Sequence, residues 1–138
     1  MGVNPPPPER KGTFFLSLTY PNVRGCLSVL NKITAGVDAV ELRVDLLRDF
    51  SEDSVADQVA LLRRHTHLPI IFTVRSQGQG GRFPNDPEAL FKLNHLAVKL
   101  SLSYIDMETH WPQQYLDDLL NVCLSLSLSL SLSLSFSL

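Results

Sequence analysis

The sequence predicts an α/β fold in which helices cover a parallel sheet. Between residues 12 and 123, a short run rich in β-branched and aromatic residues is followed by a segment of helical periodicity, and this unit occurs four times. Polar side chains gather near the carboxyl end of the apolar runs, which is where parallel sheets place their ligand sites. The chain has 138 residues and a formal net charge of −2, which suits one domain.

Four segments are predicted to be strands, because each is a short apolar run bounded by polar or turn-forming residues. Strands joined by helical segments pair in parallel, since each crossover returns the chain to the same edge of the sheet. The four predicted strands are residues 13–19, 39–44, 69–75 and 104–108.

Helices are predicted in the intervals, where apolar residues recur at spacings of three and four. The second of them has Ser51 or Ser54 at the position where a capping side chain is expected. A further helix is expected to begin near Pro112 and to run through Leu120. The other three predicted helices are residues 22–34, 54–64 and 87–100.

The two ends of the chain differ in composition from the rest. Residues 1–12 include four consecutive prolines, which favour extended chain, so we expect a disordered leader there. Residues 124–138 are a Ser-Leu repeat broken once by Phe136. This alternation without charge or proline predicts a strand former that is prone to aggregate. A CT dinucleotide repeat in a gene would encode it, so we interpret it as a sign of a gene fragment or a misassigned exon boundary.

Composition excludes several classes of function. The chain has no run of Lys and Arg, which argues against a nucleic-acid partner. It has no apolar run of about 18 residues and no signal peptide, so no membrane association is expected. Cys26 and Cys123 are too few for a disulfide framework and lack the spacing of zinc or redox sites. We therefore expect a reducing, cytoplasmic location.

The second predicted strand carries three charges on one face. The period of two places Glu41, Arg43 and Asp45 together and Leu42 and Val44 on the other face. Such charges are costly on a buried strand unless they pair or line a polar cavity. Two interpretations remain: a buried Glu–Arg ion pair, or a site in which Arg43 faces an oxyanion while Glu41 orients it.

Strands three and four supply further polar groups. Arg75 ends the third strand and can bind a carboxylate through two hydrogen bonds. The glycines of the following loop, residues 76–84, would let its backbone approach a ligand closely. Asp106 and Glu108 share one face of the fourth strand, and either could be the structural counter-ion of Arg43 or Arg75.

The histidines do not form a metal site or a catalytic pair in the sequence pattern. His65, His67 and His95 are expected on the surface. His110 is better placed, but it has no second His or Cys at ligand spacing. No lysine lies at the end of a predicted strand, so no activated lysine is identified.

In their order, these motifs resemble the first half of a type I 3-dehydroquinate dehydratase. They are most similar to the dehydratase domain within the fungal pentafunctional AROM polypeptide. The combination of ELRVD with FTVR-x4-GG-x-FP is specific. The matching segments are TFFLSLTYPNV (13–23), AGVDAVELRVDLL (35–47), QVALLRRHTHLPIIFTVRSQGQGGRFP (58–84) and YIDMETHWP (104–112).

The resemblance implies a (β/α)8 barrel of the TIM-barrel family, of which residues 13–123 would be the N-terminal half, about four βα units. It also implies conversion of 3-dehydroquinate to 3-dehydroshikimate and water in the shikimate pathway of aromatic amino acid biosynthesis, without a cofactor or metal. A lysine of the family forms a Schiff base with the substrate ketone, and a histidine acts as general base and acid.

The resemblance also implies which residues contact the substrate. Arg75 resembles the clamp on the substrate carboxylate, and Gln79 occupies a loop position where bacterial relatives carry Glu. Asp106 matches an acidic residue near the catalytic histidine, and Ser17 lies where the first strand meets the pocket. The substrate-binding residues implied are Ser17, Glu41, Arg43, Arg75, Gln79 and Asp106.

The Schiff-base lysine and the catalytic histidine come from the second half of the family's barrel, and neither has a match here. We therefore expect the chain as written to be inactive alone. Its open barrel edges would favour self-association. The alternative is a non-catalytic regulator like the fungal quinate repressor, which is similar to the same domains, and a third possibility is an unstable product without activity.

Overall fold

The described part of the chain, residues 12–126 of a computed structural model, contains a four-stranded parallel sheet. Its order is the order of the sequence, and the register pairs Ser17 with Glu41 and Thr73 with Asp106. The predicted parallel α/β architecture is therefore confirmed. The strands are β1 (Phe15–Leu18), β2 (Ala39–Arg43), β3 (Ile70–Thr73) and β4 (Tyr104–Asp106).

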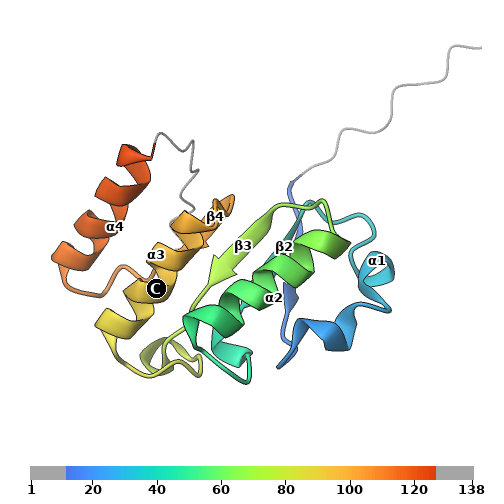
Figure 1. Cartoon of the computed structure of the whole chain (residues 1–138), viewed down its shortest axis with the longest axis horizontal. Helices are drawn as coiled ribbons and strands as arrows, with labels where there is room; N and C mark the ends of the chain where they lie inside the picture. Colours follow the sequence, from blue (N-terminus) through green and yellow to red (C-terminus); the bar gives the residue numbers. More distant parts are fainter. Residues whose placement is uncertain (1–11, 127–138) are drawn as a thin grey trace, which may run out of the picture.

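Helices cover one face of this sheet (Figure 1). Ser51 caps α2 (Glu52–His65) by accepting a hydrogen bond from the N–H of Ser54 at 3.4 Å, which decides between the two candidate caps. Asp86 caps α3 (Pro87–Lys99) by accepting from the N–H of Ala89 at 3.1 Å. No helix among residues 12–126 has the length and apolar character needed to cross a membrane.

The prediction of one continuous helix over residues 22–34 is wrong. The chain instead forms a 3₁₀ turn, Val23–Cys26, and then the single helical turn α1 (Leu30–Ile33). Gly25 lies within the 3₁₀ turn, and glycine costs a helix about 1 kcal/mol relative to alanine. The apolar spacing of the segment reflects burial of Val23, Cys26 and Leu30, not a continuous helix.

The last helix is longer than predicted. α4 (Gln113–Ser125) includes the first two residues of the Ser-Leu repeat, Leu124 and Ser125. The prediction of strand is wrong for these two residues, because a helix that is already formed adds residues at little cost. Leu126 follows as the residue that ends α4, and residues 127–138 and all of the predicted leader except Gly12 lie outside the described residues.

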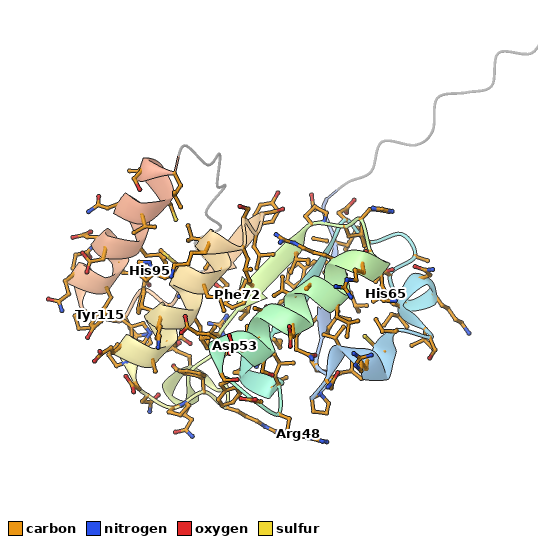
Figure 2. The ribbon with its side chains drawn as sticks, viewed as in Figure 1. Arg48, Asp53, His65, Phe72, His95 and Tyr115 are labelled. Carbon is orange, nitrogen blue, oxygen red and sulfur yellow. The ribbon has the colours of Figure 1, made fainter. Side chains whose placement is uncertain are left out.

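The core lies between the sheet and its helices. Val40, Leu42, Phe72 and Ile105 are at most 1% exposed and point from the strands toward the helical layer. Figure 2 labels Phe72 between α2 and α3. The opposite face of the sheet is not covered by any described helix, and Phe15 on that face is 56% exposed. This uncovered inner face carries the polar strand ends.

Candidate functional site

Glu41 lies on the inner face between its two neighbouring strands, and each of them provides a hydroxyl group. The Ser17 hydroxyl donates to one carboxylate oxygen of Glu41. The Thr73 hydroxyl donates to the other oxygen at 2.7 Å. Ser17 lies directly opposite Glu41 in the register of β1 and β2. Thr73 lies opposite Arg43, two residues beyond the β3 partner of Glu41, and reaches Glu41 diagonally on the same face of the sheet. Glu41 is thus fixed by polar contacts from both sides.

Arg43 pairs with Asp45. The predicted Glu41–Arg43 ion pair is therefore wrong, and it is Asp45 and not Glu41 that orients Arg43. The Nε and Nη2 atoms of Arg43 donate to the two carboxylate oxygens at 2.9 and 2.8 Å. Asp45 lies beyond β2 in a 3₁₀ turn, Val44–Leu46, which brings it back toward Arg43. The hydrogen bonding that Arg43 donates to the Asp45 carboxylate is the main cause that raises the pKa of Arg43 above its ordinary value.

Arg75 takes its counter-ions from β4 and the residues after it. Its Nη2 atom donates to Asp106, and its Nη1 atom lies 3.9 Å from a carboxylate oxygen of Glu108. Glu108 is buried and also accepts from the Ser76 N–H at 2.8 Å and from the Trp111 indole at 3.0 Å. Both carboxylates lie within ion-pair distance of Arg75, and the charge of Asp106 also acts on Arg43.

The loop after β3 folds back on the strand that precedes it. Gly80 has a φ of +82°, and a Cβ atom on Gly81 would overlap the backbone of Arg75. The close approach that Gly81 permits is therefore to the backbone of the same chain, whereas Gly80 has open space around it and meets the need for a positive φ. Gln79 ends the 3₁₀ turn Gln77–Gln79 and is exposed.

The histidines lie away from the strand-end cluster, except for His110. His65 and His67 are exposed as predicted, whereas His95 on α3 is half-buried; Figure 2 labels His65 on α2 and His95 near α4. The His110 ring packs on Trp111 with centroids 4.3 Å apart. No group of three His, Cys, Asp or Glu residues among residues 12–126 could hold a metal ion.

Two residues of this site were not identified from the sequence as contributors. Thr73 is neutral and sits within an apolar strand, so nothing in the pattern marks it. Trp111 lies beyond the end of β4, so the alternation of side chains along a strand does not predict which way it points. Its indole contact shows that the site extends beyond the strand end.

Together these contacts can present cationic donors to a small anion. A guanidinium has five N–H donors; Arg43 directs two of them to Asp45, and Arg75 directs one to Asp106. The side chains of Arg43 and Arg75 are 23% and 18% exposed. Both guanidinium groups are held in place while retaining access to solvent on the inner face.

The sequence of this chain matches a known family over most of its length. The family model described as type I 3-dehydroquinase matches residues 14–125. The chain belongs to the type I 3-dehydroquinase family. It is 47% identical over 110 residues to the pentafunctional AROM polypeptide of Malassezia globosa, covering 77% of this chain and 7% of that polypeptide. The resemblance inferred from the motifs is confirmed.

Solved structures show the same fold. The dehydroquinate dehydratase and shikimate dehydrogenase structure from S. pombe AroM matches with a TM-score of 0.80 and 38% identity, over 83% of this chain and 23% of that one. The type I 3-dehydroquinate dehydratase of Clostridium difficile matches in fold with a TM-score of 0.74 and 23% identity, over 80% and 46%. The predicted membership of the (β/α)8 family is confirmed, and the chain spans less than half of each of these relatives.

Proposed function

We propose that this chain provides the carboxylate-binding half of a 3-dehydroquinate site of the shikimate pathway. The observation that carries the proposal is Arg75, held by Asp106 and Glu108 at the carboxyl edge of the sheet and still 18% exposed. A guanidinium fixed in this way recognises a carboxylate through two parallel hydrogen bonds. Membership of the family supports 3-dehydroquinate as the small-molecule ligand.

The other proposed contacts recognise the hydroxyl groups and ketone region of the same ligand. Arg43 offers the donors that Asp45 leaves open, and Glu41 with Ser17 forms a polar wall beside it. Asp106 positions Arg75, and Gln79 would close the pocket from the loop. These roles assign the six sequence-predicted residues to one binding face.

We propose that the chain does not catalyse the dehydration alone. A Schiff base needs a lysine amine beside the substrate ketone, yet Lys32, Lys92 and Lys99 belong to helical segments and not to strand ends. Lys92 is exposed and pairs with Glu52 of α2 at 3.2 Å. The strand-end cluster described above therefore supplies binding without the covalent step.

A fluorescence titration tests the binding proposal. Trp111 is the one tryptophan of the sequence and contacts Glu108 beside Arg75, so it reports on this site. We expect 3-dehydroquinate to change its emission with weak, millimolar affinity, and Arg75→Ala to weaken that affinity at least about tenfold, the value of one lost 1.4 kcal/mol interaction. Arg64→Ala, on the exposed end of α2, is the matched control and should bind like the parent. Equal affinity in Arg75→Ala would refute the assignment.

A second assay tests catalysis separately. Turnover would produce a conjugated enone, which is measured by its ultraviolet absorbance. A Schiff base would be reduced by borohydride to a stable adduct, which is detected as an increase in the mass of the protein. We expect neither signal from the 138-residue chain. Either signal would show that the proposed inactivity is wrong, whatever the titration gives.

The regulatory alternative remains a second proposal, because a carboxylate clamp without a covalent catalyst would also suit a metabolite sensor like the quinate repressor. Sequencing the full transcript across codon 123 separates the two, since intact lysine and histidine codons in a second barrel half favour the enzyme. A cytoplasmic location is also proposed, supported by the two free, buried thiols of Cys26 and Cys123.

A further inference from the structure

Both edges of the described sheet lack a strand partner among residues 12–126. Within the described sheet, β1 pairs with β2 alone and β4 with β3 alone. The N–H and C=O groups of Phe14 both bond to Asp38, on the β2 side. Because successive residues of a strand direct these groups to opposite sides, those of Phe15 and Ser17 point away from the sheet. Such an edge is a template for another strand.

We propose that two copies of this chain pair β1 of each with β4 of the other and close an eight-stranded barrel. A twofold axis parallel to the strands preserves their direction, so both new pairings are parallel, like those already present. The twofold rotation places β1 of each copy beside β4 of the other, so all four edges of the two sheets are paired. An eight-stranded parallel barrel with its helices outside is the size at which side chains fill the interior.

The uncovered inner face has the character of a barrel interior. Its lower layer is apolar and lines an open cavity of about 370 Å³ that includes Phe15, Ile71 and Tyr104. Phe15, the first residue of the edge strand β1, is 56% exposed, and Phe14 just before it is 57% exposed. Burial of one such side chain stabilises an assembly by about 1.5–3 kcal/mol. A second copy would cover this layer from the opposite side.

In the polar layer of the same face, the positive charges are paired within each copy, so repulsion between cations does not oppose closure of the barrel. Arg43 is paired with Asp45, and Arg75 with Asp106, within one copy. The Glu41 carboxylate is held by hydroxyl groups from both neighbouring strands. Each copy therefore brings its own counter-ions to the interface.

A second copy presents the same two sheet edges and the same apolar layer, so it can pair with both edges of the described sheet at once. This proposal is independent of the proposed ligand, because its tests measure assembly and not binding of 3-dehydroquinate.

The first test measures the mass and the edge protection of the unaltered chain. Sedimentation equilibrium should give twice the monomer mass and no larger species. Residue-resolved hydrogen exchange should show protection of the Phe15 and Ser17 amides that increases with protein concentration. A monomer at about 100 μM, an open series of aggregates, or a dimer with both amides unprotected would overturn the proposal.

The second test blocks the edge with a proline. Ser17→Pro removes an N–H that points away from β2, a position where an edge strand tolerates proline. Ser17→Ala loses the same hydroxyl contact to Glu41 but keeps the N–H, so it is the matched control. We expect a folded monomer for Ser17→Pro and a dimer for Ser17→Ala, with circular dichroism confirming folding. If Ser17→Pro does not fold, the exchange measurement on the unaltered chain decides; a folded Ser17→Pro dimer would contradict the pairing.

Discussion

A Cβ atom on Gly81 would lie 2.1 Å from the main-chain carbonyl oxygen of Arg75. The loop is closed there by two backbone hydrogen bonds, from Gly81 to Ser76 at 2.8 Å and from Phe83 to Arg75 at 3.1 Å. Gly81→Ala should therefore displace the backbone that carries the Arg75 guanidinium. We expect a loss of about 3 kcal/mol in the free energy of unfolding, measured by urea titration, together with weaker binding of 3-dehydroquinate.

Gly78→Ala is the control for that substitution, in the same loop. Its Cβ atom would meet only the Asn85 side chain, at 3.2 Å, which can shift. We expect a change below about 1 kcal/mol. Equal effects of the two substitutions would mean that contact with the Arg75 backbone is not what requires glycine at position 81.

Asp45 is a second residue on which the geometry of the site depends. It is 1% exposed and accepts hydrogen bonds from two Arg43 nitrogens and from the Arg82 N–H. Asp45→Ala leaves these donors without their acceptor. We expect a loss of about 2 kcal/mol, below the usual cost of breaking a buried pair because Arg43 is 23% exposed and can reach water.

The matched control is Asp117→Ala. Asp117 is exposed on α4 and accepts a hydrogen bond from Gln113 within the same helix. Its removal should change stability by less than about 0.5 kcal/mol in thermal or urea unfolding. A neutral result for Asp45→Ala would show that Arg43 finds an equivalent partner.

Thr73→Val separates the hydroxyl group from the shape of its side chain. Thr73 is 1% exposed and donates to Glu41 at 2.7 Å, and a hydrogen bond to a charged group is worth about 1.5–3 kcal/mol. We expect a loss of about 2 kcal/mol in urea unfolding. Thr34→Val, which loses a bond to the neutral Leu30 carbonyl, should cost about half as much. A smaller loss at Thr73 than at Thr34 would contradict a charged acceptor.

The sheet was predictable because its strands are short apolar runs separated by segments of helical periodicity. Burial of one face of the sheet under helices requires this pattern. The positions of Arg75 and Asp106 also followed, since parallel strands bring their carboxyl ends to one edge. These features depend only on local periodicity and on strand direction.

The pairing of Arg43 was not predictable from the same reasoning. Strand alternation assumed that Asp45 continues β2, but the chain enters a 3₁₀ turn at Val44 and brings Asp45 back to Arg43. The first predicted helix failed for a related reason, because spacing of buried residues does not show whether Gly25 interrupts the backbone pattern. Both errors concern the point at which a regular element ends.

Burial makes Cys26 and Cys123 poor nucleophiles. They are 0% and 3% exposed, and desolvation raises the pKa of each thiol above its ordinary value. The folded chain therefore favours the protonated thiols, and this contribution to stability is present below the unfolded pKa, about 8.5, and is lost as the pH rises through the higher folded values.

At pH 8.5 we expect iodoacetamide to modify both thiols far more slowly in the folded chain than in urea, measured by peptide mass spectrometry. A Ser28→Cys variant, whose new thiol is exposed, serves as the internal control; equal folded-state rates at positions 26, 28 and 123 would show that burial does not protect them.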